Sequence, residues 1–203
     1  MIVVDLEMSG LVPEKCGIFE IGAVDLESRE TFFGNCRIDE EDVIINVGDK
    51  TVEEVTGRSE EQMRSKDKQS QKGLLEDFFS WIESKKDKII VCHNFSDIIF
   101  LNAKARKYKL KVPYGYRAFD LHSVGHFKYQ QLKGDFLISE GISDFGLSNL
   151  LEFVGMKDIR DKHNALEDAK LEAECFFRVV YGEGFFEEYE KFAVPDYLRK
   201  GDN

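Results

Sequence analysis

The sequence predicts an α/β fold in which helices cover both faces of a mixed sheet. The first observation is a series of three apolar stretches with short polar connections, over residues 1–7, 18–24 and 31–38. Consecutive strands joined in this way are typical of an antiparallel meander. The second observation is that short apolar runs alternate with helically spaced segments after residue 74, which indicates parallel strands and crossover helices.

Each later element has a local signal. Apolar residues recur at helical spacing over 74–82, and the wholly apolar run 89–92 indicates a central strand. The elements expected next are a helix over 97–109, an edge strand over 117–121, a helix over 122–132 and a loop or lid over 133–142. Ser143 or Asp144 can cap a helix that ends at Gly155, and a long helix is expected over 165–180.

Residues 39–73 are weakly patterned. We expect a short helix that ends at Gly57 and a solvated loop over 65–72. With 203 residues, of which 42% are hydrophobic and 17 are phenylalanine, the chain can form a packed core. We therefore expect one domain over 1–182, with an amphipathic extension over 183–203 packed on the same domain.

Charge and cysteine usage limit the class of protein. A net charge of −11 argues against tracking along a duplex, which requires a basic surface, but not against a strand end held through metal ions. The chain has no apolar run of about 18 residues and no basic leader, so neither a membrane partner nor a signal peptide is expected. The cysteines are scattered singly, which suits free thiols in a reducing compartment and a cytoplasmic location.

Two carboxylates stand at the end of the first apolar run. Asp5 and Glu7 are two positions apart, so on a strand their side chains share one face. Burying two adjacent like charges is costly unless a positive charge lies between them. Oxygen ligands of this kind suit a hard divalent cation.

Two later stretches add acids at the starts of helices. Asp97 falls in the first turn of its helix, where the helix dipole alone can favour an acid. Asn164 and Glu167 form an N-cap and a variant capping box, which places His163 next to Asp168 in space. Read singly, His163 is also compatible with a surface histidine, and Asp168 with a solvated acid.

Together these residues indicate a reaction. The four acids Asp5, Glu7, Asp97 and Asp168 suit a pair of divalent ions about 4 Å apart. His163 suits a general base, because the ordinary pKa of histidine is near neutral. This combination is suited to in-line phosphodiester hydrolysis.

Three stretches resemble the three motifs of the DEDDh 3′-5′ exonucleases, which include the proofreading subunit of DNA polymerase III, RNase T and oligoribonuclease. They are Asp5-Leu6-Glu7-Met8-Ser9-Gly10-Leu11, His93-Asn94-x-x-Asp97-x-x-Phe100-Leu101 and His163-x-x-x-x-Asp168. The resemblance runs from residue 1 to about residue 180 and implies an RNase H-like fold. One departure is that Phe95-Ser96 fills a gap in the second motif that is usually one residue longer.

The resemblance also implies roles for single residues. The metal ligands would be Asp5, Glu7, Asp97 and Asp168, the general base would be His163, and the nucleotide contacts would be Met8, Ser9, His93 and Asn94. The implied cofactors are two divalent cations, Mg²⁺ or Mn²⁺.

The function implied is a 3′-5′ exonuclease that releases nucleoside 5′-monophosphates from single-stranded DNA or RNA ends by a two-metal-ion mechanism. One alternative is RNA trimming of the oligoribonuclease or RNase T type. Another is a non-catalytic nucleic-acid or polymerase-binding module, although the presence of all five active-site residues argues against it. The implied protein partners are a second copy of the chain or a polymerase or processing complex.

Two other groups have weaker signals. His122 and His126 are four residues apart on an expected helix, a spacing that can bind metal, but no acid of the usual motif accompanies them. We interpret them as exposed or substrate-side residues. The basic residues around Tyr108 either contact phosphates or form a solvated helix end.

Overall fold

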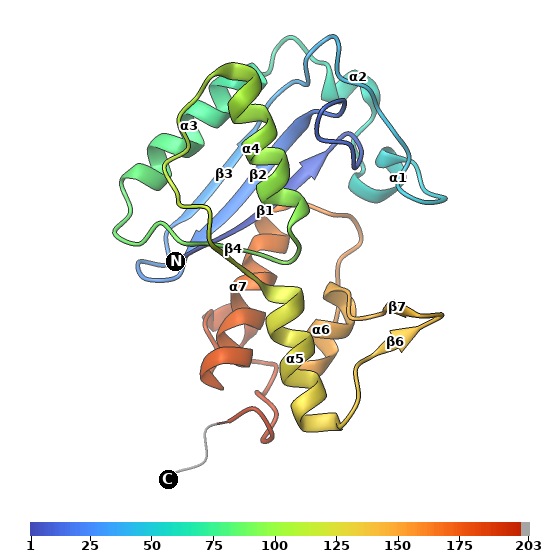
Figure 1. The fold of residues 1–203 in the computed structure, drawn as a ribbon, viewed down its shortest axis with the longest axis vertical. Helices are drawn as coiled ribbons and strands as arrows, with labels where there is room; N and C mark the ends of the chain where they lie inside the picture. The colour runs from blue at the N-terminus through green and yellow to red at the C-terminus, as the bar shows by residue number, and fades with distance from the viewer. Residues whose placement is uncertain (200–203) are drawn as a thin grey trace.

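A five-stranded sheet forms the centre of the computed structural model, which describes residues 1–199 (Figure 1). The strand order is β3-β2-β1-β4-β5. The strands are β1 (Ile2–Met8), β2 (Ile18–Asp25), β3 (Thr31–Asn35), β4 (Ile90–Cys92) and β5 (Ala118–Asp120). The first three pair antiparallel, whereas β1 with β4 and β4 with β5 pair parallel. The predicted mixed sheet is therefore confirmed.

Helices cover both faces of this sheet (Figure 1). One layer contains α3 (Gln71–Glu83) and α4 (Ser96–Tyr108), and the other contains α5 (Leu121–Lys133), α6 (Leu147–Phe153) and α7 (Ala165–Tyr181). Alternation along β1 separates two apolar cores, because Ile2 and Val4 pack with α3 and α4 whereas Val3 packs with α5, α6 and α7. By the same alternation Asp5 and Glu7 belong to the α7 face.

The connections contain short elements that the sequence pattern did not predict. The expected loop over 133–142 instead forms a small hairpin, which protrudes from the body beside α5 (Figure 1). These additional elements are α2 (Glu60–Met63), β6 (Ile138–Ser139), β7 (Ile142–Ser143) and the 3-10 helix η1 (Glu187–Tyr189). The short helix expected before Gly57 is present as α1 (Val52–Thr56).

Two local expectations were wrong. Neither Ser143 nor Asp144 caps α6, because the N-cap is Gly146 and the serine lies in β7. The expected solvated loop over 65–72 ends in Gln71, which is fully buried as the first residue of α3. Its Oε1 accepts the N–H of Ile18 at 2.9 Å, and its Nε2 donates to Asp42 at 2.8 Å. Because both polar atoms of the buried Gln71 side chain are hydrogen-bonded, this side chain fixes the start of β2.

The C-terminal segment packs on the second core. Phe185, Tyr189 and Leu198 are buried there with residues of α5, α6 and α7. Glu174 ties the segment to α7 by accepting the N–H groups of Phe185 and Phe186 at 2.9 and 2.8 Å. The segment contains the 3-10 helix η1 between irregular stretches of turns and bends, and residues 200–203 of the expected extension lie outside the described part. Over residues 1–199, every helix is too short or too polar to cross a bilayer.

The start of α7 lies directly on β2 because residue 22 is glycine. A Cβ at Gly22 would lie 2.1 Å from the backbone C and O atoms of Ala165. Gly22 pairs with Asp5 in the β1–β2 register. The missing side chain thus allows the first turn of α7, which carries Asp168, to approach the strand that carries Asp5.

We expect Gly22→Ala to lower the free energy of unfolding by about 3 kcal/mol or more, because the helix backbone must shift to admit a methyl group. Urea denaturation monitored by circular dichroism measures this change. Gly115→Ala is the matched control, since a Cβ at Gly115 meets nothing within 4 Å. Equal midpoints for the two variants would contradict the close approach of α7.

Candidate active site

The structure places the five predicted catalytic residues around one pocket. Asp5 and Glu7 come from β1, Asp97 from the first turn of α4, and Asp168 from the first turn of α7. His163 lies in the segment just before α7. All five line a pocket of about 530 Å³ at the carboxyl ends of β1 and β4. Residues more than 160 positions apart are therefore neighbours in the fold.

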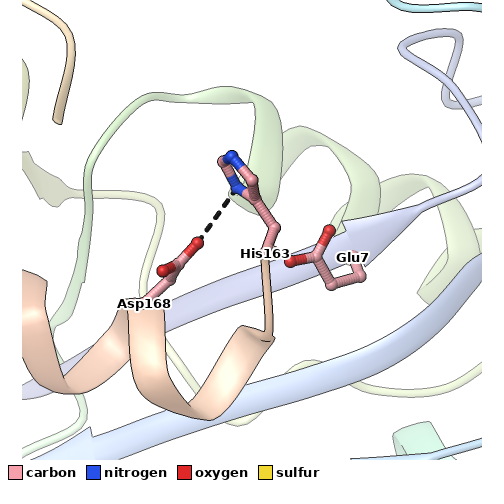
Figure 2. Close-up of side chains that lie close together, drawn as sticks. All are labelled: Glu7, His163 and Asp168. Carbon is pink, nitrogen blue, oxygen red and sulfur yellow. Dashed lines mark ion pairs between the residues drawn. The ribbon is translucent and has the colours of Figure 1, made fainter. Parts of the chain in front are cut away.

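Glu7, His163 and Asp168 form the tightest group of this pocket (Figure 2). Among the described residues, their ligand atoms all lie within 4.8 Å of one another. The Nδ1 of His163 is 3.1 Å from Oδ2 of Asp168. The imidazole is 47% exposed, whereas the carboxylate is 3% exposed, so the histidine stands at the mouth of the pocket and the acid on its wall.

Backbone and cap contacts hold the segment before α7. The Oδ1 of Asn164 accepts the N–H of Glu167 at 3.2 Å, as an N-cap does. The Nδ2 of Asn164 is 3.4 Å from Glu20 on β2, and the N–H of His163 donates to Val55 in α1 at 3.1 Å. These contacts fix the position of the His163 backbone relative to β2 and α1.

Burial and mutual repulsion dominate the electrostatics of the acids. Burial, followed by the charges of Asp168 and Glu20, raises the pKa of Glu7 to about 9. Burial raises the pKa of Asp97 to about 8. The pKa of Asp5 is also raised, first by burial and then by neighbouring carboxylates.

This donor set fits divalent cations. Oε1 of Glu7 is buried without a hydrogen-bond partner, and Oδ1 of Asp168 has no hydrogen bond but is 3.2 Å from the guanidinium of Arg160. The raised pKa of the buried Glu7 carboxyl indicates that a compensating positive charge is missing beside it, and oxygen-rich sites of this type favour Mg²⁺, Mn²⁺ or Ca²⁺. The residues that would hold such ions are Asp5, Glu7, Asp97 and Asp168.

Arg160 is a residue of the pocket that sequence reasoning missed. Its guanidinium is 3.2 Å from Oδ1 of Asp168, and it also contacts both oxygens of Asp158, at 2.9 and 2.6 Å. Ser148 of α6 donates to Asp158 at 2.5 Å and so supports this arrangement. Arg160 stands in an irregular segment without hydrophobic periodicity, so only its position three residues before His163 could have drawn attention to it.

The residues expected to contact a nucleotide divide into two groups. Met8, His93 and Asn94 line the pocket. Ser9 does not, because it is fully buried and its Oγ donates to the carbonyl of Val43 at 2.7 Å and accepts the N–H of Gly17 at 2.8 Å. Its side chain therefore fixes the turn after β1 and is not available to a nucleotide.

The two histidines of α5 differ in exposure, because His126 is buried whereas His122 is partly exposed. His126 is buried, stacks on Phe145 with ring centroids 4.8 Å apart, and accepts the N–H of Leu137 through Nε2 at 2.9 Å. The Nε2 of His122 is 2.8 Å from Oγ of Ser143. The pair thus anchors the β6–β7 hairpin to α5.

The comparisons with known proteins agree with this geometry. A family model described as an exonuclease matches residues 2–176. The chain belongs to this exonuclease family. The predicted exonuclease family is thereby confirmed. The nuclease domain of 3′hExo, described as a DEDDh family member bound to rAMP, has a similar structure. Its TM-score is 0.64 at 19% identity, over 88% of this chain and 90% of that one.

Other relatives of this exonuclease are longer proteins. The PolC-type DNA polymerase III of Caldanaerobacter subterraneus subsp. tengcongensis is 28% identical over 184 residues, and that of Thermotoga maritima is 28% identical over 183 residues. These matches cover 88% of this chain but only 11% and 12% of the polymerases. Exonuclease I of E. coli in complex with a dT13 oligonucleotide has a TM-score of 0.66 at 18% identity, over 87% of this chain and 40% of that one. At these identities the solved structures show the shared RNase H-like fold.

The raised pKa values predict how the stability of the exonuclease depends on pH. Glu7 and Asp97 keep protons in the folded protein that the unfolded chain releases near pH 4 to 5, so the metal-free protein is destabilised as pH rises from about 5 to about 9. We expect a lower melting temperature in EDTA at about pH 8.5 than at about pH 6.5. The stabilisation by excess Mg²⁺ should be larger at the higher pH, because protons and cations compete for the same oxygens.

Differential scanning fluorimetry at the two pH values measures both effects. Glu7→Gln removes one of the carboxyl groups whose pKa is raised and is expected to reduce the pH dependence of the melting temperature in EDTA. A metal-free melting temperature that rises over this range would contradict the electrostatic account of the pocket.

Proposed function

We propose that this protein is a 3′-5′ exonuclease that hydrolyses phosphodiester bonds at single-stranded 3′ ends and releases nucleoside 5′-monophosphates. The observation that carries the proposal is the convergence of Asp5, Glu7, Asp97 and Asp168 with His163 on one pocket. Bound there, two divalent cations would stabilise negative charge on the phosphate and make water more acidic. Membership of the exonuclease family supports the nuclease part of the proposal.

The pocket residues would have two separate roles, which are cation binding and proton transfer. The acids on β1, α4 and α7 would hold the cations, because all four line the pocket and Oε1 of Glu7 is buried there without a hydrogen-bond partner. His163 stands at the mouth, where Oδ2 of Asp168 can orient its Nδ1. The exposed Nε2 would then take a proton from the attacking water, which is the part of a general base.

Polarity and product are the first features to test. A single-stranded oligonucleotide labelled at its 5′ end should give a ladder that shortens from the 3′ end, and a 3′ label should appear at once as mononucleotide. EDTA should stop the reaction, and Mg²⁺ or Mn²⁺ should restore it. Absence of degradation with both metals would leave a non-catalytic binding module as the better account.

We further propose a proofreading role rather than general RNA trimming, because the chain is similar to PolC-type polymerases. A proofreading nuclease should remove a mismatched 3′ nucleotide from a primer–template faster than a matched one. Rates on a dinucleotide, a longer RNA and a single-stranded DNA distinguish this role from oligoribonuclease-like activity. Preference for the dinucleotide would support the oligoribonuclease alternative.

A further inference from the structure

A fifth carboxylate lines the pocket together with the four expected acids. Glu172 lies on α7 one turn after Asp168, so both side chains occupy the same face of the helix. It lines the same pocket, is only 1% exposed and belongs to none of the three motifs. Its charge is the strongest electrostatic neighbour of Asp5.

Glu172 has no structural partner that explains its burial. Its Oε2 is buried without a hydrogen bond. The backbone N–H of His93 donates to the Glu172 carboxylate and favours its ionised form. Among the described residues that line the pocket, Arg160 is the one arginine or lysine, and it is already bound to Asp158 and Asp168. A buried carboxylate in this position is costly unless a cation shares the site.

A second glutamate on α7 shows what a purely structural acid looks like in this fold. Glu174 is also fully buried, but it pairs with Arg178 at 2.7 Å and accepts the N–H groups of Phe185 and Phe186. Both of its oxygens are satisfied, and it faces the C-terminal segment rather than the pocket. Glu172 differs from it in both respects.

We propose that Glu172 is a fifth acidic residue of the metal site, acting together with Asp5 and Asp97 to strengthen divalent-cation binding before any nucleic acid is bound. Because Arg160 is already paired with Asp158, two divalent cations with four positive charges would supply most of the charge that offsets the five carboxylates. The inference rests on the proposed function, because it assigns a further residue to the same site. Glu172 is a positioning residue for the cation and does not contact the substrate.

The test measures Mn²⁺ binding in the absence of substrate, by titration calorimetry and by electron paramagnetic resonance of free Mn²⁺. Glu172→Gln keeps an oxygen for the N–H of His93 and the volume of the side chain, so it isolates the charge. The dissociation constant should rise on the order of 10-fold, the effect usual for residues that support metal ligands. At saturating Mn²⁺ the variant should regain most of the wild-type turnover.

Two further variants make the result decisive. Glu174→Gln removes a buried charge from the same helix and should leave Mn²⁺ affinity unchanged, even if it lowers the melting temperature. Glu172→Asp keeps the charge and should bind Mn²⁺ more tightly than Glu172→Gln. An unchanged dissociation constant in Glu172→Gln, an equal loss in Glu174→Gln, or Glu172→Asp binding as weakly as Glu172→Gln would each overturn the inference.

Failure of this inference and failure of the proposed function give different results. If wild type binds Mn²⁺ and degrades 3′ ends while Glu172→Gln binds Mn²⁺ equally well, only the role of Glu172 is lost. If the wild-type protein binds no Mn²⁺ and degrades no strand with either metal, the proposed function is lost and this inference with it.

Discussion

Asp5→Asn is expected to reduce exonuclease turnover on the order of 10³-fold or more, about 4 kcal/mol of transition-state stabilisation. Asp5 is in the middle of the central strand and shares its face with Glu7, beneath the start of α7. The substitution keeps the shape of the side chain and removes one charge from the cation site. Because burial and repulsion raise the pKa of Asp5, the metal-free variant should unfold at a higher temperature than wild type.

Steady-state rates on a labelled single strand, together with melting temperatures in EDTA, measure the two effects. Asp77→Asn removes an exposed acid of α3, far from the pocket, and serves as the matched control. A lower rate combined with a higher melting temperature is the signature of a functional acid that is strained in the metal-free fold. A variant that retains nearly full rate would mean that the ligand set is wrong.

His163→Ala is expected to lower turnover on the order of 10²-fold or more, the contribution typical of a general base. The side chain is half exposed and its contact in the structure is Asp168, so its removal should leave the fold intact. Mn²⁺ affinity should change little, since oxygen ligands dominate the site. Added imidazole should restore part of the lost rate by occupying the space that the side chain leaves.

Single-turnover rates and Mn²⁺ titrations separate the two roles open to this residue. His122→Ala, which removes a different imidazole that does not line the pocket, is the control for loss of a histidine. If Mn²⁺ affinity falls in proportion to the rate, His163 is a ligand rather than a base. Figure 2 shows why this alternative needs a test, because the imidazole lies between two carboxylates.

Strand alternation was sufficient to predict the fold and the placement of two acids. Asp5 and Glu7 share a face because the period of a strand is two, and the apolar residues on either side define that strand. Asp97 and Asp168 could be grouped with this pair as further acids at the starts of helices, and the motif resemblance supported the grouping, but no local rule relates residues on different elements. The structure adds the physical link, which is the close approach of α7 at Gly22.

The parts that sequence reasoning missed are those where a polar residue is buried or a strand is very short. Glu172 and Gln71 look like ordinary polar positions of a helix and a loop, and only the packed structure shows that both are buried. Arg160 stands in an irregular segment where periodicity gives no signal. The strands β6 and β7 are two residues long and exposed, so they leave almost no alternating pattern.

The wide spacing of the acids along the chain has a consequence during synthesis. The strand with Asp5 and Glu7 leaves the ribosome well before α7, whereas His163 and Asp168 follow only after all five strands of the sheet and α5 and α6 have been made. The N-terminal part of a chain can begin to fold while translation continues. A nascent chain that lacks α7 nevertheless has an incomplete set of the predicted metal ligands while it is still close to messenger and ribosomal RNA. The order of the elements thus delays the proposed nuclease activity until α7 has been made.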